Sequence, residues 1–487
     1  MSVRVRFAPS PTGELHIGSV RTTLYNFFFA RQNNGTLILR IEDTDQARFD
    51  PRALPSIYDG LRWIGIDWDE GPREGGPHGP YVQSERLGLY QEHARRLVEL
   101  GAAYFCFCSP ERLAQVRAAQ RARGDPVTRY DRFCRRIDAM EAADRATRDA
   151  HVVRLKVPDE GTIGIDDLVH GHVEWPLASI DDQVLLKSDG FPTYQLAVVI
   201  DDHVMGITHV LRGDEWLPST PKHLLVYRAF GWDVPPHGHL PSVLGTEGGK
   251  KLSKREGAAV VAVAEFREGG YLPEALVNYL ALVGWAPGSE DEVFTIDELV
   301  RRWRIDQVQK GGGRWDPERL KWFNGVWIRR LSDDELLHRL DPFVPSEWDR
   351  AVVRAALPII KERMETLTQA KELLGFLFTD DLPTDPTRLL PKKRTAPETR
   401  DAIARARAAL AANGAFSKPA IQAALEGAAA QLGWKQGDVN MAVRLAVTGT
   451  NVGPPLYESI ALLGRDRALA RLSHAEAVLA GPDPARS

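Results

Sequence analysis

The spacing of apolar residues changes twice within the first forty residues of the chain. Residues 3–7 alternate apolar side chains with arginines, a pattern typical of a half-buried strand. Apolar residues between Val20 and Phe28 recur on one helical face, and 36–41 (TLILRI) is a nearly continuous apolar run, as in a strand buried on both faces of a parallel sheet. The pattern predicts one βαβ unit. Because open α/β sheets bind ligands at the ends of parallel strands, we expect the functional site to begin at 42–45 (EDTD).

Strand-like patterns continue through the front half of the chain. A helical pattern covers 85–101 and leads into a cysteine- and arginine-rich segment. Strand-like apolar runs follow at 152–157, 183–187, 196–200 and 207–212. We expect these runs to resume and complete the sheet after an inserted domain.

Helical patterns dominate the back half of the chain. Beyond about residue 330 strand-like runs nearly disappear, and 398–414 and 458–480 are amphipathic helices with little β propensity. The Pro-rich stretch 382–397 is predicted to link two helical domains. The predicted architecture is therefore an α/β front half that carries an insertion, followed by a helical back half.

Composition narrows the class of protein. Of 487 residues, 43% are hydrophobic and 26% are charged, which indicates a globular chain of about three to five domains. The net charge of −4 argues against a general polyanion binder, so an RNA partner would have to meet local basic patches such as 109–136, with eight arginines and three acidic residues. The chain opens without an apolar signal segment and has no apolar run of about 18 residues, which predicts a soluble cytoplasmic protein without a membrane partner.

Two separated motifs carry the candidate chemistry. In 10–19 (SPTGELHIGS), between the first strand and helix, Gly18 allows close backbone approach to a ligand. His16 precedes a helix N-terminus, which favours phosphate. More than two hundred residues later, 245–258 (GTEGGKKLSKREGA) is a glycine-rich loop with several cations. Alone, the first could be a turn beside a core histidine and the second a solvated basic loop.

Together the two motifs resemble the His-Ile-Gly-His and Lys-Met-Ser-Lys-Ser signatures of class I aminoacyl-tRNA synthetases, with Ser19 in place of the last histidine and Leu252–Arg255 in place of Met-Ser-Lys-Ser. Further segments narrow the resemblance to bacterial glutamyl-tRNA synthetases and extend it over essentially the whole chain. They are RFAPSPTG at the start, RIEDTD at 40–45, PTY at 192–194, VLRGDEW at 210–216, PEALVNYLALVGW at 273–285 and AVTG at 446–449.

The resemblance implies an α/β fold class: a Rossmann-like parallel-sheet catalytic domain with an inserted acceptor-binding domain, then all-helical anticodon-binding domains. The implied boundaries are 1–100 and 188–245 for the two catalytic halves, 101–187 for the insertion, 246–327 for the stem-contact region with the KLSKR loop, and 328–381 and 382–487 for the helical domains.

The resemblance also implies roles for individual residues. Glutamate would be bound by Arg6, Ser10, Glu42, Tyr194 and Arg212. ATP would be bound by His16, Gly18, Glu215, Trp216, Lys251 and Lys254, with His16 and Lys254 as the catalytic pair. Arginine forks suit the carboxylates of glutamate, and a carboxylate suits its ammonium group. Arg363, within KERMETL, corresponds to the arginine that reads the wobble base of the anticodon.

The three cysteines leave two readings open. An odd number of cysteines in so long a chain is no disulfide framework and fits a reducing compartment. Cys106, Cys108, Tyr130 and Cys134 resemble the zinc knuckle of some glutamate enzymes, but Arg136 stands where some relatives have histidine. Three thiolates would need a fourth ligand, so either a structural Zn²⁺ or three buried or free thiols fit the sequence.

The implied activity is that of a glutamate–tRNA ligase. It would activate L-glutamate with ATP and Mg²⁺ to glutamyl-adenylate, then esterify the terminal ribose of tRNA(Glu). The match at Arg363 implies an enzyme that discriminates against tRNA(Gln), and the family resemblance implies a monomer.

Four alternatives differ in chemistry or partner. A glutaminyl-tRNA synthetase should have a β-rich back half, and a glutamyl-queuosine synthetase should lack the segment beyond 327. A simple adenylating nucleotidyltransferase would act without tRNA. A non-enzymatic tRNA-binding paralogue should have lost His16 or Lys254, and both are present.

Overall fold

The computed structural model describes residues 2–245 and 262–481, which fall into two compact units. The first contains the described residues of Met1–Phe266 together with Pro273–Pro317. The second contains the described residues of Arg267–Leu272 together with Glu318–Ser487. The six domain boundaries implied by the sequence remain predictions.

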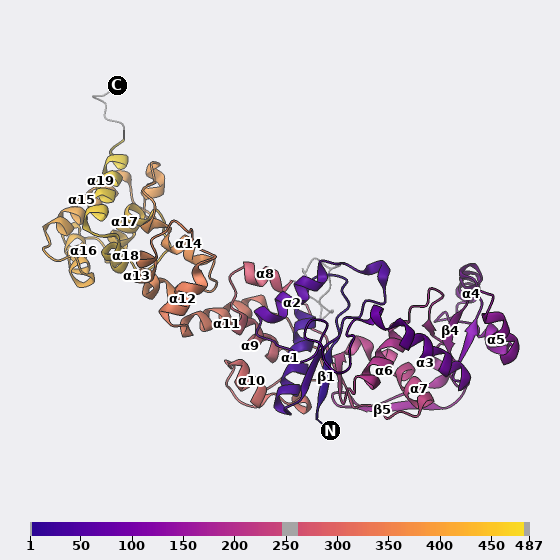
Figure 1. The fold of residues 1–487 in the computed structure, drawn as a ribbon. Coiled ribbons are helices and arrows are strands. Elements are labelled where there is room, and N and C mark those ends of the chain that lie inside the picture. Colours follow the sequence, from indigo (N-terminus) through magenta and orange to yellow (C-terminus); the bar gives the residue numbers. More distant parts are fainter. Residues whose placement is uncertain (1, 246–261, 482–487) are drawn as a thin grey trace. The chain divides into compact units, whose positions relative to one another are not determined.

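The predicted βαβ unit is present at the start of the first unit (Figure 1). Strand β1 (Arg4–Phe7) lies parallel to β2 (Thr36–Leu39), and helix α1 (Ile17–Gln32) connects them. The return to β2 is tight, because a Cβ at Gly35 would lie 2.4 Å from the Val3 carbonyl oxygen. A side chain there would push the two strands apart, so glycine is required at this position.

A second pair of parallel strands completes the α/β arrangement. Strand β8 (Val210–Gly213) pairs in parallel with β9 (His237–Leu240), and α7 (Thr220–Phe230) connects them. The Thr208 amide donates a 2.9 Å hydrogen bond to the Arg4 carbonyl, so the chain entering β8 lies beside β1. Strands from both sides of the insertion thus meet, as the predicted class I fold requires.

Three of the four strand-like runs do not belong to this parallel arrangement. Strand β4 (Val152–Leu155) lies antiparallel between β3 (Ala103–Cys106) and β7 (Val184–Leu186), in a separate three-stranded sheet. The strand predicted at 196–200 was wrong, because this run lies within helix α6 (Tyr194–Val204). A helix that is buried on nearly every side has the same continuous apolar pattern as a buried strand.

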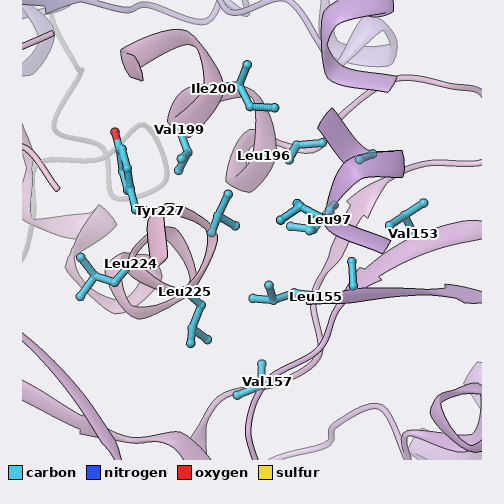
Figure 2. Packing of buried hydrophobic residues seen from close by; sticks show 14 of the residues in the cluster. Leu97, Val153, Leu155, Val157, Leu196, Val199, Ile200, Leu224, Leu225 and Tyr227 are labelled. Atoms are coloured by element: carbon cyan, nitrogen blue, oxygen red, sulfur yellow. The ribbon is translucent and has the colours of Figure 1, made fainter. Parts of the chain in front are cut away.

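Helices α6 and α7 share one hydrophobic core with the inserted sheet (Figure 2). Figure 2 labels Leu97, Val153, Leu155, Val157, Leu196, Val199, Ile200, Leu224, Leu225 and Tyr227. They come from α3 (Leu87–Glu99), β4 and the residue stretch after it, α6 and α7. Because packing in such a core is dense, it holds the inserted sheet at a defined position against the two helices that border the candidate site.

The first unit also contains a two-stranded hairpin and several further helices. The hairpin joins β5 (Thr162–Asp167) to β6 (Gly171–Pro176). The helices are α2 (Ala53–Trp63), α4 (Pro110–Ala122), α5 (Ala139–Ala146), α8 (Val263–Glu268), α9 (Pro273–Leu282) and α10 (Ile296–Arg302), of which α8 continues into the second unit.

The second unit is helical, as predicted, with no strand among its described residues. Its helices are α11 (Pro317–Arg330), α12 (Asp333–Leu340), α13 (Arg350–Ile360), α14 (Gln369–Leu374), α15 (Ala396–Ala412), α16 (Lys418–Leu432), α17 (Gln436–Thr448), α18 (Leu456–Leu463) and α19 (Arg465–Ala480). The predicted helix 458–480 is two helices that meet at Gly464, whose φ of 84° interrupts the α-helical conformation.

Truncating the shared core should destabilise the first unit. Leu196 is fully buried, so Leu196→Ala is expected to lower the free energy of unfolding by about 2–5 kcal/mol. The same change at Leu100, which is 44% exposed, is the matched control and should cost far less. Chemical denaturation of both variants measures the difference, and equal losses would contradict the role given to this core.

Candidate active site

One cavity of about 460 Å³ lies at the ends of β1 and β8 and beside the start of α1. It brings together every residue predicted to bind glutamate or ATP that lies within the described parts of the chain. These are Arg6, Ser10, His16, Gly18, Glu42, Tyr194, Arg212, Glu215 and Trp216. Lys251 and Lys254, in contrast, lie outside the described residues.

His16 occupies the N-cap of α1. Its Nδ1 accepts a 3.4 Å hydrogen bond from the Ser19 amide, and its Nε2 lies 3.2 Å from the Ser19 hydroxyl. A Cβ at Gly18 would lie only 3.3 Å from the imidazole ring, so the glycine lets the ring lie across the start of the helix. The unpaired amides and the dipole at this end of the helix favour negative charge beside His16.

Glu42 is held by a buried network of opposite charges. Arg40, which is fully buried, donates hydrogen bonds to Glu42 at 3.0 Å and to Asp202 at 2.8 Å. Asp202 also accepts two hydrogen bonds from Arg6, at 3.0 and 3.3 Å. The Glu42 amide donates to the Pro9 carbonyl, which places Glu42 beside Ser10. Burial raises the pKa of Glu42, while the charges of Arg40 and Arg6 act in the opposite direction.

Arg212 lies at the end of β8, and its side chain contacts histidine, threonine and tyrosine side chains instead of carboxylates. It is 5% exposed and donates to His239 Nε2 at 3.0 Å, Thr220 Oγ1 at 2.9 Å, His223 Nδ1 at 3.1 Å and Tyr194 Oη at 3.3 Å. The Tyr194 ring stacks on Trp216 with centroids 3.9 Å apart. The arrangement presents a cation and an aromatic platform to the cavity.

Several residues that support the site were not predicted from the sequence. They are Arg40, Asp202, Asp167, His223 and His239. Arg40 carried a signal, because a cation interrupts the apolar run of its strand. Asp202 carried a similar one, since it follows the apolar run 196–200. The pairing of Asp167 with His239 joins residues 72 apart and has no local signal.

The three cysteines gather with Tyr130 beside β3, within the first unit. Their sulfur atoms all lie within 4.8 Å of one another, and Cys108 and Cys134 are 3.5 Å apart. A tetrahedral ion with Zn–S bonds of about 2.3 Å would separate its sulfurs by roughly 3.8 Å. The Tyr130 hydroxyl lies 3.4 Å from Cys106 and 3.5 Å from Cys108, and Arg136 is exposed. Hydrogen bonds, above all from Cys134, lower the pKa of Cys106, and the same contact raises the pKa of Cys134, so the two thiols share one proton between them.

Arg363 lies in the second unit, in the short 3-10 turn Lys361–Arg363 that follows α13. It is exposed, and it has no ion-pair partner among the residues that the structure describes. Burial, and after it the charge of Arg363, lowers the pKa of Arg444.

Family models cover both units. The model described as "tRNA synthetases class I (E and Q), catalytic domain" matches residues 2–322, and the model described as "Anticodon binding domain" matches residues 335–476.

Relatives match over nearly their whole length. The glutamate–tRNA ligases of Chloroflexus aurantiacus and Acidothermus cellulolyticus are each 45% identical to this chain. The alignments cover 98% of this chain in both cases, and 98% and 96% of the two relatives. The crystal structure of a glutamate tRNA ligase from Elizabethkingia meningosepticum in complex with its amino acid is 34% identical, with a TM-score of 0.88 over 98% of this chain and 100% of that one.

Membrane insertion through a helix finds no support in the structure. Within 2–245 and 262–481 no helix combines the length and the apolar character that crossing a bilayer requires.

The buried histidine behind Arg212 should make stability depend on pH. Burial, and after it the charge of Arg212, lowers the pKa of His237 to about 3, from 6.5. Below pH 6.5 only the unfolded chain takes up this proton, so folding stability is lost as pH falls toward 3, at about 1.4 kcal/mol per pH unit. His237→Gln should reduce this slope, because the amide can still donate to the Pro235 carbonyl and does not titrate.

Denaturation curves between pH 6 and 4 measure the slope. The matched control is His172→Gln, which replaces a histidine whose side chain is 67% exposed. Equal slopes for the wild type and His237→Gln would contradict the assignment.

Proposed function

The chain belongs to the class I glutamate–tRNA ligases, and on this premise we propose that it forms glutamyl-adenylate from L-glutamate and ATP and transfers glutamate to tRNA(Glu) while excluding tRNA(Gln). The observation that carries the proposal is the convergence of nine predicted site residues on one cavity. A monomeric state and a cytoplasmic location belong to the same proposal.

The charges around the cavity support a glutamate pocket with divided roles. Arg6 is already neutralised by Asp202, whereas Arg212 has no carboxylate partner among the described residues. Arg212 is therefore the cation best able to receive the side-chain carboxylate of glutamate. Glu42, buried and held by Arg40, is the anion for the substrate ammonium group. Ser10 and Tyr194 complete the pocket.

The start of α1 supports phosphate binding beside that pocket. In the first step the glutamate carboxylate attacks the α-phosphate of ATP and releases diphosphate, and negative charge builds on the phosphoryl oxygens. His16 can stabilise that charge by hydrogen bonding, assisted by the helix dipole. Gly18, Glu215 and Trp216 line the same cavity and would hold the nucleotide. Mg²⁺, which accompanies ATP in this enzyme class, supplies charge neutralisation on the phosphates.

The second step needs no further nucleophile from the protein. A hydroxyl of the terminal ribose of tRNA attacks the carbonyl carbon of the adenylate, and AMP leaves. Lys254 remains the proposed catalytic partner of His16, and Lys251 a proposed ATP ligand; both are outside the described residues. In this proposal catalysis consists of positioning and electrostatic stabilisation.

Zn²⁺ is the proposed occupant of the thiol cluster. Cys106, Cys108 and Cys134 would supply three sulfur ligands, and Tyr130 lies in reach for the fourth position. When bound, the ion would cross-link β3 to the segment around Cys134.

Charging assays with two tRNAs test the proposed specificity. We expect glutamate to be esterified to a tRNA(Glu) transcript and not to tRNA(Gln). An arginine fork can distinguish base-edge acceptors, so Arg363→Gln should relax this preference by about 10-fold or more. Arg405→Gln, at an exposed arginine already paired with Asp401, is the matched control.

Each other outcome has a distinct meaning. Charging of both tRNAs by the wild type would reject the discriminating assignment and keep the ligase. An unchanged preference in Arg363→Gln would reject this arginine as the reader of the wobble base. ATP–pyrophosphate exchange without any tRNA requirement would favour a simple adenylating enzyme.

Metal analysis tests the proposed zinc site. Protein purified without chelator or a metal-affinity column should carry about one Zn²⁺ per chain, and Cys134→Ser should lose most of it. A stoichiometry well below one in the wild type would favour the alternative of three free thiols.

A further inference from the structure

Arg212 is a buried cation whose hydrogen-bond partners are all neutral. They are two imidazole nitrogens, the hydroxyl of Thr220 and the hydroxyl of Tyr194. Among the described residues no carboxylate lies within ion-pair distance of its guanidinium. Arg6 and Arg40, in contrast, both bind Asp202 directly. Since an unpaired buried charge is costly, this choice of partners calls for an explanation.

The chemistry of the guanidinium fixes the tautomer of His239. Arginine can only donate, so Nε2 of His239 must be unprotonated to accept its 3.0 Å hydrogen bond. The ring proton then lies on Nδ1, which donates to Asp167 at 2.6 Å. Both side chains of this pair are fully buried. Asp167 thus selects the tautomer that can hold Arg212.

Asp167 is itself fixed by backbone amides. It accepts hydrogen bonds from the amides of Val169 and His170 at 3.0 Å and from the amide of His239 at 3.2 Å. Although burial opposes ionisation, these bonds and the His239 contact lower the pKa of Asp167 to about 2. Asp167 is the last residue of β5 in the hairpin 162–176, so the inserted region reaches the pocket through this carboxylate.

The imidazole keeps the carboxylate one ring away from Arg212. Because Coulomb attraction falls with distance, the guanidinium is held in place while most of its positive charge stays available to a ligand. A direct carboxylate partner would hold Arg212 equally well but would neutralise it, as Asp202 does for Arg6.

His223 supports the same reading from the other side of the guanidinium. Its Nδ1 accepts from Arg212 at 3.1 Å, so its proton lies on Nε2. That Nε2 is buried and has no hydrogen-bond partner among the described residues. The one hydrogen bond that the His223 side chain makes among the described residues is therefore the one that holds Arg212.

We propose that Asp167, His239 and His223 are positioning residues that hold Arg212 with its charge uncompensated, and that this arrangement sets the preference of the pocket for glutamate over glutamine. The proposal rests on the proposed role of Arg212 in binding the side-chain carboxylate of glutamate. It adds that the hairpin 162–176, through Asp167, helps to determine amino-acid specificity.

The test is steady-state aminoacylation with glutamate or ATP varied separately. In Asp167→Asn the amide can donate to Nδ1 and favour the wrong tautomer, whose Nε2–H points at Arg212. We expect the KM for glutamate to rise about 10-fold or more, with the KM for ATP unchanged. The ratio of kcat/KM between glutamate and glutamine should fall in parallel. Asp166→Asn, at the exposed neighbour that pairs with His172, is the matched control and should leave both values unchanged.

Variants of His239 keep the test decisive if Asp167→Asn folds poorly. His239→Gln retains an acceptor toward Arg212 without a ring tautomer, so its KM for glutamate should stay nearer to that of the wild type than the KM of His239→Leu. Asp167→Asn should add little in the His239→Gln background. Equal KM values for the two His239 variants, or full additivity in the double variant, would overturn the proposal that Asp167 positions Arg212 through His239.

One further variant separates failure of this proposal from failure of its premise. If Arg212→Gln leaves the KM for glutamate unchanged, the proposed role of Arg212 is wrong. If Arg212→Gln raises that KM but Asp167→Asn and His239→Leu do not, Arg212 keeps its role and only the positioning roles of Asp167 and His239 are rejected.

Discussion

The carboxylate of Asp202 ties the two halves of the catalytic fold together. It lies on α6, after the insertion, and accepts hydrogen bonds from Arg6 on β1 and from Arg40 just beyond β2. All three side chains are at most 4% exposed. Breaking a buried pair of this kind costs about 3–5 kcal/mol, because the remaining charge cannot return to water. Arg40 also holds Glu42, so the same contact that joins the halves sets the position of a proposed substrate ligand.

The two sides of the pocket treat their arginines in opposite ways: one side neutralises their charge, and the other leaves it uncompensated. On the β1 side, arginines and carboxylates neutralise one another, which stabilises the fold. On the β8 side, Arg212 is surrounded by imidazole and hydroxyl groups, which hold it but leave its charge available. A site that binds an anion cannot satisfy all of its cations internally. The cost in stability is met by the dense hydrophobic contacts of α6 and α7 beneath it.

The insertion contributes more than a separate sheet. Its strand β4 shares a core with the helices that border the site, and its hairpin supplies Asp167 to the surroundings of Arg212. Earlier in the same insertion, before β4, the three thiols gather around Tyr130. Because close-packed interiors deform little, a shift of the insertion would also shift the residues of the pocket against which it packs.

The sequence by itself determined the βαβ start and the helical back half, and its resemblance to glutamyl-tRNA synthetases identified nine of the residues that line the cavity. The first two depend on local periodicity, and the third depends on motifs that the chain shares with that family. It could not decide whether 196–200 forms a strand or a helix, because full burial removes the polar positions that reveal the period. Nor could it show Asp167 beside His239 or Asp202 between Arg6 and Arg40. Those pairings join segments far apart in the chain, and only the packing of the insertion against the parallel strands brings their charges within hydrogen-bonding distance.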